Sequence, residues 1–165
     1  MVIVLLAEGF EEIEALTPVD ILRRKGVNVK TVGMTGELVY GSHGIGVLAD
    51  LTVDEVDLGD IEMTILPGGM PGTLNLDKNS YTDVYINAAI ENGGRVAAIC
   101  AAPLMLGRRG LLKGKKATCF PGFENELRGA EVLKERVVTD GIITTACGME
   151  AALDFAKEIE RLIVK

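Results

Sequence analysis

Short apolar segments alternate along this chain with segments whose apolar residues recur at helical spacing, and this alternation restricts the fold most. Residues 2–7 and 96–99 are uninterrupted apolar runs and 63–66 is nearly so, as expected for parallel strands buried on both faces. Residues 13–25 and 149–164 show the periodicity of helices. Since helices between parallel strands form right-handed crossovers, the sequence predicts a three-layer α/β/α sandwich around a mostly parallel sheet.

Pro18 lies inside the first helical segment and predicts an interruption there. Proline disfavours the helical conformation of the residue before it, here Thr17. We therefore expect a bend, or a helix whose regular part begins near Pro18, with residues 11–14 in a separate turn. The other expected elements are strands at 27–32, 117–120, 137–139 and 142–145, a small hairpin or edge excursion at 37–49, an acidic loop at 54–60, and helices at 81–89 and 101–106.

Length and charge limit the domain organisation and the classes of partner. A chain of 165 residues has the size of one domain, so we expect a single domain over 1–165. Its 24 Asp and Glu against 17 Lys and Arg give a net charge of −7, which disfavours nucleic acid as a partner. The longest apolar run, 96–106, contains Pro103 and is shorter than the roughly 20 residues that cross a bilayer. We expect no membrane segment and, because residues 2–7 resemble a strand more than a signal peptide, a cytoplasmic location.

Cys100 gives the strongest local signal for chemistry. It directly follows the apolar run 96–99 and precedes Pro103, a residue favoured in the first turn of a helix, so the order is that of a hydrolase nucleophile elbow. A thiol there lies near the positive end of a helix dipole, which lowers its pKa and favours the reactive thiolate. Amides of the same turn can stabilise an oxyanion. The alternative is that Cys100 is a small buried hydrophobic residue, as free cysteines often are.

The carboxylates after the first strand supply a candidate proton carrier. Glu11, Glu12 and Glu14 occupy three of four positions, and they cannot all be buried without a raised pKa. Glu11 and Glu12 suit a solvated helix start, where acidic groups favour the dipole. Glu14 is flanked by the apolar Ile13 and Ala15, so we expect it to face inward. The Gly- and Pro-rich loop at 67–72 is a further site candidate, because such loops adopt unusual backbone angles.

The remaining cysteines and the only histidine carry weaker signals. Cys119 and Cys147 are not followed immediately by a helix start, and we expect reduced, inert thiols. His43 lies in a glycine-rich segment, where an exposed or hydrogen-bonded role is commoner than catalysis, so a Cys-His-Asp triad is disfavoured. With one histidine and no closely spaced cysteine pair, no metal site is predicted.

Four segments, taken together, match one known family. They are Glu11-Glu12-Ile13-Glu14, Pro18-Val19-Asp20 with Arg23-Arg24-Lys25-Gly26, Leu66-Pro67-Gly68-Gly69, and Ala98-Ile99-Cys100-Ala101-Ala102-Pro103. Through them the chain resembles the ThiJ/PfpI superfamily, specifically its parkinsonism-associated protein deglycase branch. The resemblance runs nearly end to end and implies a flavodoxin-like sandwich, similar to class I glutamine amidotransferases, that forms a homodimer.

The same resemblance implies a site and an activity. Cys100 would be the reactive cysteine and Glu14 a protonated carboxyl hydrogen-bonded to it, with Gly69 and Ala101 supplying oxyanion-hole amides and Gly68 beside them. The implied activity is conversion of methylglyoxal or glyoxal to hydroxy acids, or repair of glycated adducts, without a cofactor. Alternatives within the family are an oxidative-stress sensor or chaperone that depends on oxidation of Cys100, and a peptidase-like or thiazole-biosynthesis role.

Three places depart from the family pattern. Phe120 stands where many relatives have a histidine before the proline, so the imidazole that would assist proton transfer is absent. His43 stands where relatives often carry an arginine near the dimer contact. We expect both Phe120 and His43 at the pocket. Residues 145–148 differ from the usual Gly-Pro-Gly turn. The histidine's absence weakens the glyoxalase and peptidase interpretations and leaves a pair of Cys100 and Glu14.

Overall fold

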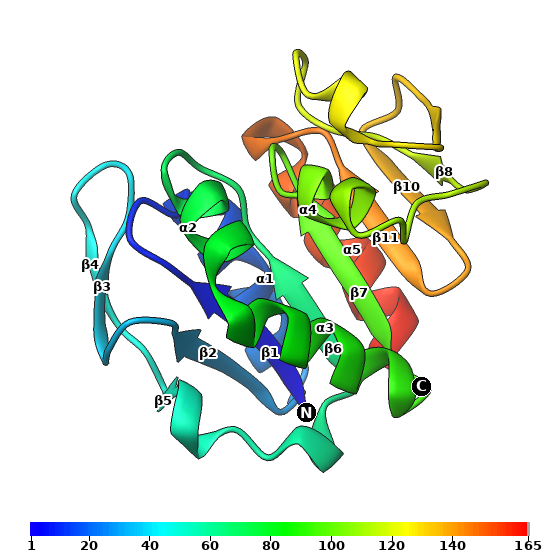
Figure 1. Ribbon diagram of the computed structural model, residues 1–165. Helices are drawn as coiled ribbons and strands as arrows, with labels where there is room; N and C mark the ends of the chain where they lie inside the picture. The colour runs from blue at the N-terminus through cyan, green and yellow to red at the C-terminus, as the bar shows by residue number, and fades with distance from the viewer. Residues whose placement is uncertain (165) are drawn as a thin grey trace.

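A seven-stranded, mostly parallel sheet forms the centre of the molecule in the computed structural model, which describes residues 1–164 (Figure 1). The strand order is β10-β11-β7-β6-β1-β2-β5, and only β10 runs antiparallel to its neighbour. The chain therefore has the predicted flavodoxin-like α/β arrangement. The strands are β1 (Val2–Leu6), β2 (Val29–Gly33), β5 (Leu51–Thr52), β6 (Met63–Leu66), β7 (Arg95–Ile99), β10 (Val137–Asp140) and β11 (Ile143–Ala146).

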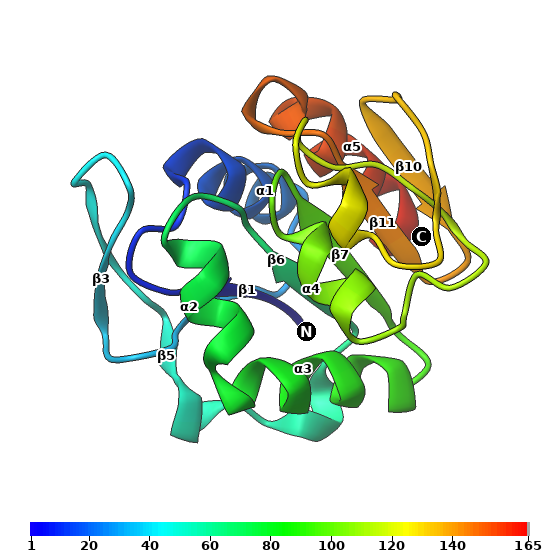
Figure 2. The same ribbon diagram turned by 45° about the horizontal axis from the view of Figure 1, so that its top comes forward.

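Helices cover both faces of this sheet, as Figure 2 shows from above. Those on one face are α1 (Glu12–Arg24) and α5 (Ala152–Ile163), and those on the other are α2 (Gly72–Lys78), α3 (Ser80–Glu91) and α4 (Pro103–Arg108). Alternate residues of β1 enter the two cores: Ile3 and Leu5 pack with α2 to α4, and Val2, Val4 and Leu6 with α1 and α5. This double burial explains why β1 is wholly apolar.

Smaller elements lie outside the main sheet. The predicted hairpin is present as β3 (Leu38–Tyr40) and β4 (Gly46–Leu48), which pair antiparallel. A second small sheet joins β8 (Lys116–Ala117) to β9 (Glu131–Val132). The 3-10 turns are Val53–Glu55, Leu58–Asp60, Glu124–Glu126 and Met149–Ala151. Within residues 1–164 the longest helix has 13 residues, and no helix is both long and apolar enough to cross a membrane.

The expected interruption of the first helix is wrong. Helix α1 runs without a break through Pro18, and residues 12–14 form its first turn. Glu11 caps this turn by accepting a hydrogen bond from the Glu14 amide at 2.7 Å, and Ala15 and Leu22 are fully buried. Packing against the sheet outweighs the local cost of the proline.

Other boundaries also differ from the sequence prediction. In place of the strand expected at 117–120, the structure has the shorter β8 at Lys116–Ala117. The acidic loop expected at 54–60 contains 3-10 turns. The elements α2, β5 and β9 were not predicted. These are short segments, in which too few residues repeat for a periodic pattern to emerge.

Candidate active site

Three neighbouring strands deliver the candidate residues to one end of the sheet. β1, β6 and β7 are adjacent and parallel, so the segments that follow their carboxyl ends lie side by side. These segments are the start of α1, the loop at 67–72 and the turn at Cys100. The structure therefore brings together Glu14, Gly68 and Cys100 although they are far apart in sequence.

Cys100 occupies the predicted turn between β7 and α4. Its φ angle is 66° and it is the only described residue other than glycine with a positive φ, a conformation that is strained for a side-chain-bearing residue. Two backbone hydrogen bonds hold it: its amide donates to Ala146 at 2.9 Å, and its carbonyl accepts from Phe120 at 2.8 Å. Strand, strained residue and helix follow one another as the elbow pattern predicts.

Glu14 faces the interior, as expected, and is completely buried. Its Oε2 atom accepts a hydrogen bond from the Gly68 amide at 2.9 Å, and its Oε1 atom has no well-formed hydrogen bond. A methyl group added at Gly68 would collide with both Oε2 of Glu14 and Cβ of Cys100. Only glycine fits at this position, and the close approach of carboxyl and cysteine depends on it.

The carboxyl and the thiol shift each other's protonation. Burial raises the pKa of Glu14 to about 7, and the nearby Glu11 charge adds to this, whereas hydrogen bonds from Cys100 and Gly68 act in the opposite direction. Burial, and after it the Glu14 charge and hydrogen bond, together raise the pKa of Cys100 to about 12. When Glu14 and Cys100 together hold a single proton, that proton therefore resides on the Cys100 sulfur and the Glu14 carboxyl is ionised.

This result corrects the expectation of an acidic thiol. The helix dipole and the amides of the turn favour the thiolate, but the free-energy cost of burying a thiolate beside a carboxylate is larger. The amides of Ala101 and Gly69 do donate to the Cys100 sulfur and lower its pKa, yet burial outweighs them. Glu14, which is half ionised near neutral pH, is thus placed to accept the thiol proton.

Gly69 and Ala101 both lie next to Cys100. Both direct a backbone amide at the sulfur of Cys100. Gly69 has a φ of +92°, and a side chain there would collide with the backbone of Gly9 and Glu11. The loop at 67–72 is therefore packed directly against the start of α1, and a glycine is required in it.

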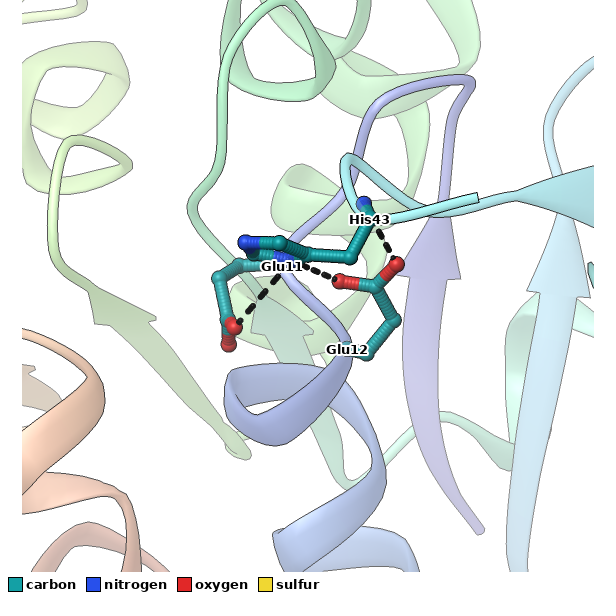
Figure 3. A group of neighbouring side chains, drawn as sticks. All are labelled: Glu11, Glu12 and His43. Carbon is teal, nitrogen blue, oxygen red and sulfur yellow. Dashed lines mark hydrogen bonds and ion pairs between the residues drawn. The ribbon is translucent and has the colours of Figure 1, made fainter. Parts of the chain in front are cut away.

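His43 lies in a different cluster, shown in Figure 3. Its backbone amide donates to Oε1 of Glu12 at 2.7 Å, and its Nδ1 lies 2.7 Å from Oε2 of the same carboxylate. Burial alone would raise the pKa of Glu12, but the hydrogen bonds from His43 lower it. An ionised carboxylate only accepts, so Nδ1 carries a proton. His43 thus ties the β3–β4 loop to α1, and no hydrogen bond links it to Cys100 within residues 1–164.

The same cluster is the one group in residues 1–164 with the ligand atoms for a metal ion. One ligand atom each of Glu11, Glu12 and His43 lies within 4.8 Å of the others. Both oxygens of Glu12 already accept hydrogen bonds from His43, and Oε2 of Glu11 caps α1. These groups satisfy one another, so the arrangement is a structural link between the hairpin and the helix.

Phe120 lines a cavity of about 790 Å³ next to the elbow. Its ring packs near Gly148 and its backbone amide donates to the Cys100 carbonyl, whereas Cys100 and Glu14 are not among the residues that line this cavity. Its side chain offers no proton donor or acceptor. Cys119 and Cys147 line the same cavity, a proximity that sequence reasoning missed. The available signal was that each follows the end of a strand, β8 and β11.

Comparison with known proteins identifies close relatives of the chain. A model described as the DJ-1/PfpI family matches residues 1–162. Protein dj-1beta of Drosophila melanogaster is 34% identical over 160 residues, which are 95% of this chain and 86% of that protein. A protein named deglycase from Thermococcus kodakarensis is 33% identical over 143 residues, 85% of each chain. A structure of Toxoplasma gondii DJ-1, described as oxidized, has a TM-score of 0.91 and 34% identity, and the match covers 98% of this chain and 90% of that one.

Proposed function

The chain belongs to the DJ-1/PfpI family, and from this premise we propose that it is a cofactor-independent, deglycase-like enzyme acting on reactive aldehydes. The substrate class is methylglyoxal or glyoxal, or their adducts on amines, and the products are hydroxy acids. The observation that carries this proposal is the strained Cys100 with the buried Glu14 carboxyl and two amides directed at its sulfur. The deglycase name of an archaeal relative supports the substrate class.

The first step is addition of the Cys100 thiol to the aldehyde carbon. The Glu14 carboxylate takes the thiol proton as the carbon–sulfur bond forms, and the carbonyl electron pair moves to oxygen. The amides of Gly69 and Ala101 would stabilise that oxyanion. Return of the proton to oxygen gives a hemithioacetal. A pKa of about 7 suits Glu14 to both directions of transfer, since a catalytic acid or base works best near the ambient pH.

The later steps convert the hemithioacetal to the acid. Glu14 would move the proton of the former aldehyde carbon to the neighbouring carbonyl carbon, and the hydroxyl proton of the first carbon moves to the oxygen of the second. The first carbon is thereby oxidised to a thioester carbonyl and the second is reduced to an alcohol. The resulting thioester is cleaved by water, which releases the hydroxy acid and restores the thiol. In the net reaction, one dicarbonyl molecule and one water molecule give one hydroxy acid. Phe120 stands in place of the histidine of many relatives and its side chain can neither donate nor accept a proton, so no imidazole assists at this position and we expect a modest rate.

The test is turnover of a dicarbonyl panel by matched variants. Purified wild type, Cys100→Ala and Glu14→Gln are incubated with methylglyoxal and glyoxal, and hydroxy acid is measured. We expect Cys100→Ala to abolish product and Glu14→Gln to reduce the rate by about 10²- to 10⁴-fold, the usual contribution of acid–base assistance. Glu91→Gln, at an exposed position of α3, is the control. Full turnover by Cys100→Ala would refute the proposal.

Sensing of oxidative stress by the same residue is the second candidate, favoured by the sulfur's surroundings. Peroxide would oxidise Cys100 to a sulfenic and then a sulfinic acid, each step consuming one peroxide and adding one oxygen to sulfur. The amides of Gly69 and Ala101, and Glu14 when protonated, could bind these oxygens. A relative from Toxoplasma gondii is described as oxidized. Inert protein that gains two oxygens at Cys100 under mild peroxide would support this function over the enzyme.

We also propose that the protein acts as a cytoplasmic homodimer. Exposed apolar residues on α1 and the hairpin, Ile13, Leu38, Tyr40 and Leu48, are compatible with a partner subunit on that side. Light scattering after size exclusion tests the proposal: a mass of twice 17.6 kDa is expected, and a monomer at micromolar concentration contradicts it. Cell fractionation tests the location.

A further inference from the structure

Contacts on both sides of Cys119 and Cys147 hold these two cysteines next to each other. Before them in sequence, the Thr118 amide donates to the hydroxyl of Thr145 at 2.9 Å. After them, the ring of Phe120 lies against Gly148. The residues that flank the two cysteines therefore touch on both sides, and the proposal requires the Cα atoms of Cys119 and Cys147 to come within roughly 4 to 7 Å, the separation that a disulfide spans.

The side chains share one environment. Both cysteines line the 790 Å³ cavity, and both are free thiols. Cys119 is 6% exposed, whereas Cys147 is only partly buried. Burial, together with the charges of Glu124 and Cys147, raises the pKa of Cys119 to about 11. Cys147 is therefore the more accessible of the two thiols to a reagent that enters the cavity.

We propose that Cys119 and Cys147 are a second thiol pair, which a hydroperoxide converts to a reversible intramolecular disulfide. This assignment goes beyond the proposed function and does not depend on catalysis by Cys100. It gives chemical roles to two cysteines for which the local sequence predicts none.

The reaction has two balanced steps. The Cys147 thiolate attacks the peroxide O–O bond, which breaks to leave a sulfenic acid on sulfur and to release the second oxygen as water or an alcohol. Cys119 then attacks the sulfenic sulfur, the S–S bond forms, and the hydroxyl leaves as water after taking the Cys119 proton. Together, two thiols and one hydroperoxide give one disulfide, one water molecule, and a second water molecule or an alcohol. A dithiol such as dithiothreitol reverses the reaction by exchange.

The pair is coupled to the elbow through the backbone. The residue after Cys119, Phe120, donates to the Cys100 carbonyl, and the residue before Cys147, Ala146, accepts from the Cys100 amide. A disulfide between Cys119 and Cys147 would covalently join the two segments that hold Cys100 in its strained conformation. The oxidation state of the pair can in this way affect the reactive turn without contacting its sulfur.

Peptide mapping tests the proposal on the full chain. Trypsin places Cys100, Cys119 and Cys147 on separate peptides, 96–108, 117–128 and 137–157. Reduced protein is treated with equimolar hydrogen peroxide, blocked with N-ethylmaleimide and digested without reductant. We expect an intact mass lower by two hydrogens and a cross-linked peptide of 117–128 with 137–157 that dithiothreitol removes.

Variants separate this result from oxidation at Cys100. Cys147→Ser and Cys119→Ala should each abolish the cross-link, and Cys100→Ser should retain it. Cys147 is partly exposed, so its variant remains informative if Cys119→Ala does not fold. The proposal is overturned if both thiols stay open to N-ethylmaleimide while Cys100 gains oxygen, or if the cross-link joins Cys100 or a second chain.

Discussion

Replacing Glu14 with glutamine should remove a specific part of the pH dependence of stability. The Glu14 carboxyl has a pKa of about 7 in the folded protein against 4.5 when unperturbed, chiefly because it is buried. The folded state therefore binds this proton more tightly than the unfolded state does. The stabilisation is complete below about pH 4.5 and is lost as pH rises towards 7.

The size of the effect follows from the shift. The difference between about 7 and 4.5, at roughly 1.4 kcal/mol per pKa unit, corresponds to about 3 kcal/mol. For a chain of this length that is a fall of roughly 10 °C in Tm between acidic and neutral pH. The glutamine side chain of the Glu14→Gln variant would stay neutral at every pH, and its amide oxygen can still accept the hydrogen bond from Gly68.

The assay is urea unfolding, followed by circular dichroism, at about one-unit steps from pH 5 to 8. Subtracting the wild-type free energy from that of Glu14→Gln cancels titrations common to both proteins, including that of His43. We expect the difference to rise by about 2.5 kcal/mol in favour of the variant across this range, because part of the stabilisation is already lost at pH 5. Glu91→Gln, at an exposed position, is the control. A flat curve for Glu14→Gln would refute the buried, proton-binding carboxyl.

Three further predictions concern the site and its surroundings. The rate of hydroxy acid formation should rise with pH through about 7 as Glu14 ionises, and Glu14→Gln should lose this rise in initial-rate measurements. Gly68→Ala should reduce turnover and cost about 1 to 3 kcal/mol in urea unfolding, because its methyl group would collide with Glu14 and Cys100; normal turnover and stability would contradict the packing. The hydrogen bond and charge of Glu12 raise the pKa of His43. The stability that protonated His43 contributes is therefore present below about pH 6.5 and is lost as pH rises through the raised pKa. His43→Gln should abolish this loss, and NMR titration of the ring should give a pKa above 6.5.

Much of the site was predictable because its signals are local. The turn at Cys100 follows from an apolar strand, one cysteine and a proline, and the inward direction of Glu14 follows from its apolar neighbours. The protonation of the thiol was not predictable. It depends on burial by elements from the whole chain and on the distance to a carboxyl that lies 86 positions earlier.

The outcome at Pro18 has the same cause as the missed cysteine pair. The local conformational preference at Pro18 favours a break in α1, but burial of Ala15 and Leu22 against the sheet stabilises a continuous helix. Likewise Cys119 and Cys147 carry no local sign of each other, and only the pairing of strand ends places them at one cavity.

By itself the sequence determined the layers, the strand–helix order and the identity of the elbow cysteine, because each of these depends on solvation and backbone preference within a few residues. Only the tertiary structure decided where the proton of the Cys100–Glu14 pair resides, which residues His43 binds, and which thiols are neighbours. Those properties are set by electric fields and distances between groups far apart in the chain, and no periodic pattern encodes them.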